Sequence, residues 1–214
     1  MDGTLLESEA LARACFLKAC EDLGWADPDI SIYNQCVGST WENTKITLLE
    51  GFGPTFPVDD LQERWRVHYY AFIEHHPVDV KPGIMELIQV LTHHEIPMAV
   101  ATSSGRESAT IKLDKAGLLP HFAGLVCGGE TTRGKPFADP YLHATQMIQR
   151  QPATCWALED SEHGVRSALA AGLQVIHIPD ELPPGKNVLA LSDVFLDDAR
   201  PLAQRVSDLV SKTP

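Results

Sequence analysis

The sequence has no long apolar run and no excess of basic charge, and each absence excludes a class of function. None of its 214 residues lies in an apolar stretch of about 18 residues, the minimum for a membrane-spanning helix. There is also no basic segment followed by an apolar run of the secretory-signal type. The 29 acidic and 17 basic side chains give a net charge of −12. We therefore expect no export, no membrane insertion and no nucleic-acid partner.

The cysteine pattern does not favour disulfides. The count is odd, and no two cysteines form a C-x-x-C pair. Most lie among apolar neighbours, which is typical of small buried side chains. The five positions are Cys15, Cys20, Cys36, Cys127 and Cys155. The pattern predicts a protein of the reducing cytoplasm.

The segment from about residue 9 to residue 78 has the pattern of helices and no buried strand. Helices are expected over 8–23, 40–49 and 60–75, where helix-forming residues run between glycines and prolines. This segment is predicted to be a helical cap inserted into a larger domain.

From Pro82-Gly83 onward, short apolar runs alternate with helical patterns. Ser104 and Glu107 fit a capping box for one helix, and Asp139-Pro140 fits an N-cap followed by a first-turn proline. The expected strands are 97–101, 124–127, 155–158, 174–178 and 194–196. Such alternation predicts a doubly wound α/β fold with a mostly parallel sheet. The predicted domains are an α/β core of residues 1–8 and 79–214 and a cap of residues 9–78.

Polar residues directly follow two of the expected strands. Thr102 follows the first apolar run, and Glu159 and Asp160 follow the third. In open parallel sheets, ligands bind at the carboxyl ends of the strands. Adjacent carboxylates after a buried strand are unfavourable unless a cation lies beside them. The sequence thus predicts a polar site, with a metal ion, at this edge of the sheet.

Four short motifs occur in order: Asp2-Gly3-Thr4, Thr102-Ser103, Gly134-Lys135-Pro136 and Glu159-Asp160-Ser161. In type, order and spacing they resemble the motifs of the haloacid dehalogenase superfamily, in the subgroup with a helical cap after the first motif. The resemblance covers nearly the whole chain. Each motif alone is weak evidence, but the combination is specific.

The resemblance implies a role for each motif in phosphoryl transfer. Asp2 would be the general acid and base, two residues after a nucleophilic aspartate. The hydroxyl of Thr102 and the backbone of Ser103 would bind the phosphoryl group. Lys135 would bridge that group and the nucleophile.

The same resemblance implies a Mg²⁺ site. The backbone carbonyl of Asp2 would be one ligand, and Glu159 and Asp160 would hold the ion, with Asp160 the direct ligand. Gly38 lies where related proteins place substrate-recognition loops in the cap.

The first motif departs from the family pattern. An apolar strand and the nucleophilic aspartate should come immediately before Met1, and neither is present in the 214 residues. That strand belongs at the centre of the sheet, between those expected at 97–101 and 155–158. Its absence predicts an open trough in the core and unpaired backbone groups on both neighbours. We hypothesise that Met1 is an internal residue of a longer chain and that the chain as given has negligible phosphatase turnover.

Each motif also has an interpretation without chemistry. Thr102-Ser103-Ser104 is typical of a helix N-cap, Lys135 alone of a solvated lysine, and Glu159-Asp160 of a turn. The pairs His75-His76 and His93-His94 suit solvated helix ends better than a metal site, because neighbours on a helix diverge by about 100°.

The function implied by the resemblance is Mg²⁺-dependent hydrolysis of a small phosphate monoester, such as a sugar phosphate, through an aspartyl-phosphate, by a monomer or weak homodimer. A phosphomutase of the β-phosphoglucomutase type is one alternative, although Ala12 stands where those mutases carry a histidine. Asp2 argues against a dehalogenase or phosphonatase, which typically lack that acid. A non-catalytic phosphate-binding protein is the remaining alternative.

Overall fold

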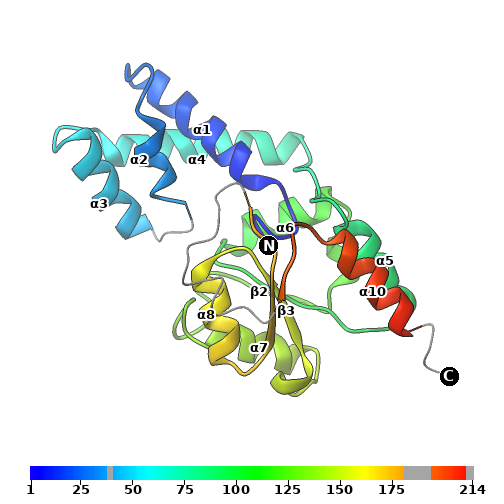
Figure 1. The fold of residues 1–214 in the computed structure, drawn as a ribbon. Helices are drawn as coiled ribbons and strands as arrows, with labels where there is room; N and C mark the ends of the chain where they lie inside the picture. Colours follow the sequence, from blue (N-terminus) through cyan, green and yellow to red (C-terminus); the bar gives the residue numbers. More distant parts are fainter. Residues whose placement is uncertain (38–40, 181–193, 211–214) are drawn as a thin grey trace. The chain divides into compact units, whose positions relative to one another are not determined.

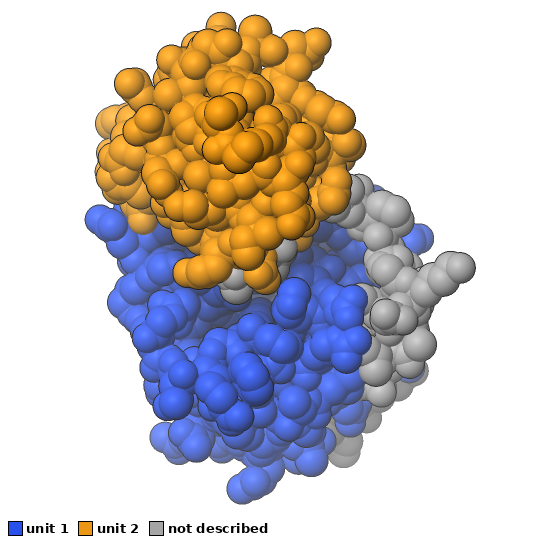
Figure 2. Space-filling view, turned by 90° about the vertical axis from the view of Figure 1, so that its left-hand side faces the viewer, with its two compact units in different colours: residues 1–7, 77–214 blue, residues 8–76 orange. Residues whose placement is uncertain are grey.

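The computed structural model describes residues 1–37, 41–180 and 194–210. The chain divides into two compact units, each with its own core (Figure 2). The α/β unit comprises residues 1–7 and 77–214, and the helical unit comprises residues 8–76. No helix in the described ranges is long and apolar enough to cross a membrane.

Aromatic packing forms the centre of the helical unit. Its helices are α1 (Ser8–Asp22), α2 (Ile30–Asn34), α3 (Trp41–Phe52) and α4 (Val58–His75). The ring of Phe16 lies 4.8 Å from that of Tyr33 and 5.4 Å from that of Trp65, centroid to centroid. The indole of Trp65 donates a hydrogen bond to the carbonyl of Ala12 at 2.9 Å, which ties α4 to α1. Edge-to-face rings and a satisfied indole N–H give this small unit a specific core.

The described residues of the α/β unit contain five short parallel strands (Figure 1). They are β1 (Val100–Ala101), β2 (Leu125–Val126), β3 (Trp156–Glu159), β4 (Gln174–His177) and β5 (Val194–Phe195). Within the described residues they form two separate pieces of sheet, ordered β1-β2 and β3-β4-β5. The parallel strands alternate with helices, which confirms the predicted α/β fold class.

Helices cover the strands on two faces, as the apolar strand sequences require. The helices of this unit are α5 (Ile84–His93), α6 (Arg106–Lys115), α7 (Asp139–Met147), α8 (Glu162–Ala170) and α10 (Arg200–Val210), with 3₁₀ turns at Leu119–His121 and Pro152–Thr154. Helix α7 contacts β1 and β2, and α8 contacts β3 and β4. Helices α5 and α10 pack against each other (Figure 1).

One core cluster joins the strands to α7 and α8. It includes Ala101 of β1, Ala157 of β3 and Val175 of β4, which alternate in each strand with residues of the other face. Small residues on β1 and β3 allow these helices to pack close to the sheet. The cluster also buries Val165 of α8 completely.

The sequence-based capping predictions were wrong in detail. Helix α6 begins at Arg106 with Gly105 as its N-cap and has no side-chain cap hydrogen bond. The hydroxyl of Ser104 instead donates to Asp2, far away in the sequence. Helix α7 begins at Asp139 itself, so this residue lies one position inside the helix rather than at its N-cap. In both places, local sequence patterns were misleading about the exact helix start.

Candidate active site

A tight turn at the start of the chain positions Asp2. The N–H groups of Leu5 and Leu6 both donate to the carbonyl of Met1, at 2.8 and 3.2 Å, and the N–H of Gly3 donates to the carbonyl of Leu6 at 3.1 Å. Gly3 has a φ of 67°, a left-handed conformation that glycine adopts without strain. Leu6 is fully buried and anchors the turn in the core.

Two groups hold the carboxylate of Asp2. The hydroxyl of Ser104 donates to its Oδ2 at 2.6 Å, and the ammonium of Lys112 forms an ion pair with its Oδ1. Burial by itself would raise the pKa of Asp2, but the charges of Lys112 and the N-terminal amine, together with the hydrogen bonds from Lys112 and Ser104, lower the pKa to about 2. Asp2 is therefore ionised at neutral pH.

Lys135, Glu159 and Tyr141 form a buried polar cluster. Both the Lys135 ammonium and the Tyr141 hydroxyl donate to Oε1 of Glu159. Burial alone would raise the pKa of Glu159, but the charges of Lys135 and the Met1 amine, with the hydrogen bonds from Lys135 and Tyr141, together lower it below its usual value. Burial and the Glu159 charge raise the pKa of Tyr141, so its hydroxyl keeps its proton and donates it. A Cβ at Gly164 would lie 1.9 Å from Oε2 of Glu159, so α8 approaches this carboxylate closely.

The carboxylate of Asp160 has a different environment from that of Glu159. Its Oδ1 accepts a hydrogen bond from the hydroxyl of Thr4. Burial and the charge of Glu159 raise the pKa of Asp160 to about 6. A Cβ at Gly3 would lie 2.5 Å from Oδ2 of Asp160 and 2.7 Å from Oδ2 of Asp180, so two carboxylates converge on this glycine. The negative charge here is poorly compensated, unlike that of Glu159.

The α-amine of Met1 lies among the same groups. Burial and the positive charge of Lys135 lower its pKa, while Asp160, Glu159 and Asp2 act in the opposite direction. These four side chains are thus close enough to the buried nitrogen for their charges to act on it. The structure thus brings together residues of three predicted motifs, the first of which lies more than 130 positions before the other two.

Thr102 and Ser103 follow β1. Thr102 is buried, and its hydroxyl accepts a hydrogen bond from the N–H of Ser104 at 3.1 Å, whereas Ser103 is exposed. A Cβ at Gly128 would lie 2.2 Å from the carbonyl oxygen of Ser103, so this turn requires a glycine opposite it. The remaining predicted residue, Gly38, lies outside the described residues.

The donor set fits a hard cation at Asp160 better than at the other two acids. In the described ranges, no three Asp, Glu, His or Cys side chains by themselves form a metal-binding group. Lys112 and Lys135 neutralise Asp2 and Glu159 respectively. In the described part of the chain, the buried Oδ2 of Asp180 has no hydrogen-bond partner, while its Oδ1 pairs with Lys81 at 2.6 Å. A cation would stabilise the ionised form of Asp160, and the Asp2 carbonyl would be an oxygen ligand of the kind that Mg²⁺ prefers.

Sequence reasoning missed four residues of this site: Thr4, Ser104, Lys112 and Tyr141. Lys112 is only 1% exposed and lies between apolar positions of α6, so its sequence neighbourhood does not distinguish it from a surface lysine. Tyr141 lies in the first turn of α7, and nothing in its local sequence indicates a contact with Glu159. Only the three-dimensional fold brings these side chains to the predicted carboxylates.

Comparison with known proteins identifies the family of this chain. The family model described as haloacid dehalogenase-like hydrolase matches residues 1–178. The chain belongs to this family. It is a haloacid dehalogenase-like hydrolase, as the motif pattern predicted.

Individual relatives share most of this hydrolase's length. Protein CbbY of Rhodobacter capsulatus is 29% identical over 98% of this chain and 96% of its own. Hexitol phosphatase A of Escherichia coli is 33% identical over 83% of this chain and 80% of its own. The crystal structure of CbbY from Rhodobacter sphaeroides in complex with phosphate superposes with a TM-score of 0.76, at 26% identity over 94% of this chain and 93% of its own.

Proposed function

We propose that this hydrolase is a Mg²⁺-dependent phosphatase of a small phosphate monoester, such as a sugar phosphate. The observation that carries the proposal is the buried ion pair of Lys135 with Glu159, directly beside Asp160, which accepts a hydrogen bond from Thr4 of the first motif. A buried lysine can hold the phosphate dianion, and the poorly compensated carboxylate beside it can hold the metal cation that accompanies the dianion. The names of similar proteins, among them a hexitol phosphatase and a phosphorylated carbohydrates phosphatase, support the choice of substrate class.

The metal ion has one role in this proposal. Held by the Asp160 carboxylate and the Asp2 carbonyl, Mg²⁺ would neutralise the phosphoryl dianion and so permit a carboxylate to approach it. Glu159 would act indirectly, by fixing the position of Lys135, because its Oε1 already accepts hydrogen bonds from both Lys135 and Tyr141.

The chain's own residues would bind the phosphoryl group and move protons. The Lys135 ammonium, the Thr102 hydroxyl and the Ser103 N–H would hold the phosphoryl oxygens. Asp2 is ionised in this structure, so it is ready to accept a proton from an attacking water. To act first as an acid, Asp2 must gain a proton, which requires a bound substrate to weaken its ion pair with Lys112.

The proposed nucleophile is an aspartate placed directly before Met1. Its carboxylate would attack phosphorus, displace the alcohol and form an aspartyl-phosphate, which water would then cleave to release phosphate. The helical unit would act as the cap that selects the substrate, in a cytoplasmic protein that is a monomer or weak homodimer.

Two measurements test the proposal. The chain as given should bind inorganic phosphate in the presence of Mg²⁺ by titration calorimetry, and Lys135→Met should weaken this binding at least about tenfold, since a buried charge-assisted contact is lost. The surface variant Lys115→Met is the matched control and should bind normally. Equal binding by wild type and Lys135→Met would contradict the assigned phosphate site.

Turnover requires the nucleophile. A chain extended at Met1 by an apolar segment ending in aspartate should release phosphate from a panel of sugar phosphates with Mg²⁺. The same extension ending in asparagine should be inactive, and so should the aspartate form carrying Asp160→Asn. No release from any monoester by the aspartate form, with phosphate binding intact, would overturn the hydrolase mechanism and favour a phosphate-binding protein.

A further inference from the structure

Asp180 is a largely buried carboxylate that belongs to none of the four motifs, and only 11% of its side chain is exposed. It lies three residues after the end of β4, whereas Asp160 directly follows β3. The two strands are parallel neighbours, with Glu159 opposite His177. Parallel strands end at one edge of their sheet, and ligands bind there. Both aspartates therefore emerge on the side of the candidate active site.

The two oxygens of the Asp180 carboxylate have different surroundings. Oδ1 forms an ion pair with the Lys81 ammonium at 2.6 Å. Oδ2 is buried and, among the described residues, has no hydrogen-bond partner. A Cβ at Gly3 would lie 2.7 Å from this oxygen and 2.5 Å from Oδ2 of Asp160. Two carboxylate oxygens thus converge on the open side of a glycine, and a buried charged oxygen without a partner is costly.

Lys81 holds Asp180 in place relative to the N-terminal turn. Its backbone N–H donates to the carbonyl of Leu5 at 2.9 Å, and its side chain, only 10% exposed, reaches Asp180. One residue therefore contacts the turn that contains Gly3 through its backbone and Asp180 through its ammonium. Because this ion pair is largely buried, salt screens it much less than a surface pair. The position of the Asp180 carboxylate beside Asp160 is thus maintained by a specific contact.

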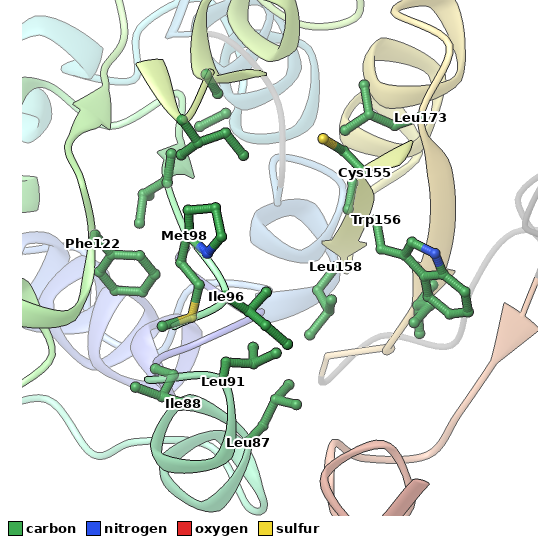
Figure 3. A pocket seen from close by; sticks show the side chains of 18 of the residues that line it. Leu87, Ile88, Leu91, Ile96, Met98, Phe122, Cys155, Trp156, Leu158 and Leu173 are labelled. Carbon is green, nitrogen blue, oxygen red and sulfur yellow. The ribbon is translucent and has the colours of Figure 1, made fainter. Parts of the chain in front are cut away.

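The inner side of the N-terminal turn offers these carboxylates little compensation. Thr4, which donates to Asp160, also lines an apolar cavity of about 530 Å³. Figure 3 shows the border of this cavity, where every labelled side chain, from Leu87 of α5 to Leu158 of β3, is apolar or aromatic. An apolar wall does not stabilise charge. The charge that remains on Asp160 and on Oδ2 of Asp180 is therefore best compensated by a cation.

Mg²⁺ fits this pair of carboxylates. The ion usually keeps several of its water molecules in proteins and binds through one or two carboxylates. Groups that accept hydrogen bonds from its first ligands orient those ligands and raise the affinity. We propose that Asp180 is a positioning residue of the Mg²⁺ site, whose Oδ2 accepts hydrogen bonds from water bound to the ion at Asp160, and that Lys81 fixes this carboxylate through Oδ1. The inference rests on the proposed function, because it takes the ion at Asp160 from there.

Binding of Mn²⁺ to the full chain tests the inference without turnover. Mn²⁺ prefers the same oxygen ligands as Mg²⁺, and the electron paramagnetic resonance signal of the free ion measures the bound fraction. Asp180→Asn should weaken binding at least about tenfold, as the loss of an outer partner does in other metal sites. The matched control is Asp208→Asn at an exposed position of α10, which removes the same charge. It should change the affinity less than about twofold, because salt screens distant surface charges.

Lys81→Gln separates this role from a purely structural one. The glutamine amide can still donate to Oδ1 of Asp180, but the positive charge near the ion is gone. Mn²⁺ should therefore bind this variant at least about threefold more tightly than the wild type. If the Lys81–Asp180 pair only maintained the local fold, Lys81→Gln would weaken binding in the same direction as Asp180→Asn. Weaker or unchanged binding by Lys81→Gln would overturn the inference.

Asp160→Asn distinguishes failure of the inference from failure of the proposed function. Loss of Mn²⁺ binding in Asp160→Asn, with Asp180→Asn no weaker than Asp208→Asn, would overturn the role of Asp180 and leave the metal site intact. Normal binding by Asp160→Asn, or no binding by the wild type, would contradict the metal site itself and with it this inference. The thermal midpoint of each variant checks that it is folded. If either Asp180→Asn or Lys81→Gln does not fold, the other variant still decides, because each has its own expected direction of change.

Discussion

The buried ammonium of Lys112 forms an ion pair with the carboxylate of Asp2, across 110 positions of sequence. Lys112 is 1% exposed, whereas Asp2 is 23% exposed and also accepts a hydrogen bond from Ser104. The ion pair attaches the N-terminal turn to α6, and it keeps Asp2, the proposed general acid and base, ionised. The contact therefore connects the stability of the fold with the proton chemistry of the proposed site.

Replacing Lys112 should destabilise the protein at neutral pH. Lys112→Met leaves a partly buried carboxylate without its cation, and we expect a loss of about 2–3 kcal/mol of unfolding free energy, less than for a fully buried pair because Asp2 retains some solvent. Denaturant unfolding measures the change. The matched control is Lys115→Met on the exposed face of the same helix, which should change stability by less than about 0.5 kcal/mol. Equal effects of the two variants would show that the ion pair contributes no net stability.

Gly164 should not tolerate a methyl group, although it lies in a helix. In an exposed helix, Gly→Ala normally stabilises by about 0.5–1 kcal/mol. At Gly164, however, the added Cβ would lie 1.9 Å from Oε2 of Glu159. Gly164→Ala should therefore displace this carboxylate and destabilise by about 1–3 kcal/mol, as overpacked cores do. Gly105→Ala is the control, because no heavy atom lies within 4 Å of its added Cβ. A more stable Gly164→Ala variant would contradict the close approach of α8 to Glu159.

The sequence predicted the fold class and the location of the strands better than the detailed site. Apolar runs such as 155–158 and 174–178 become strands, because a strand between two layers of helices needs apolar side chains on both faces. Helix starts were less predictable. Ser104 satisfied the local capping rule, yet its hydroxyl donates to Asp2, because an ionised, partly buried carboxylate is a stronger acceptor than the alternatives near α6.

The supporting residues of the site could not be predicted for a similar reason. Lys112 and Tyr141 are defined by long-range contacts to Asp2 and Glu159, and no local periodicity encodes such contacts. Thr102 and the Glu159-Asp160 pair were accessible from the sequence because they lie at the ends of apolar strands. Asp2 and Lys135 were accessible only through the combination of motifs. Lys135 and Glu159 are in contact in the structure, while their proposed catalytic roles stay a prediction.

The hydroxyl of Tyr141 should stabilise Glu159 independently of the ring. Tyr141→Phe keeps the ring near the Lys135 ammonium, 5.3 Å from its centroid, but removes the donor to Oε1 of Glu159. We expect a loss of about 1–3 kcal/mol, because a buried charged acceptor loses a hydrogen bond. A double-mutant cycle with Glu159→Gln measures the coupling, which should exceed about 0.5 kcal/mol. Additive effects of the two substitutions would mean that the hydroxyl acts on another group.

The buried charge of Asp160 should make stability depend on pH. The folded-state pKa of about 6 lies above the usual value of 3.8, so the folded protein binds this proton more tightly than the unfolded chain does. The resulting stabilisation is fully present below about pH 4 and is lost as the pH rises through about 6. Asp160→Asn resembles the protonated form at every pH and still offers an acceptor to Thr4. It should therefore stabilise the protein by on the order of 2 kcal/mol at pH 7.5 and by little at pH 4.

Mg²⁺ provides the complementary test of the same carboxylate. If Asp160 holds the ion, millimolar Mg²⁺ should raise the thermal midpoint of the wild-type chain at pH 7.5, because the cation compensates the charge that burial and Glu159 make unfavourable. The effect should disappear in Asp160→Asn, and in the wild type it should weaken below about pH 6 as protons compete with the ion. Ca²⁺ at equal ionic strength is the control that distinguishes a site selective for Mg²⁺ from general charge screening. Mg²⁺ is the smaller ion and demands near-octahedral oxygen geometry, so a selective site should respond differently to the two ions. An Asp160→Asn variant that gains as much from Mg²⁺ as the wild type would place the ion elsewhere and remove Asp160 from the proposed metal site.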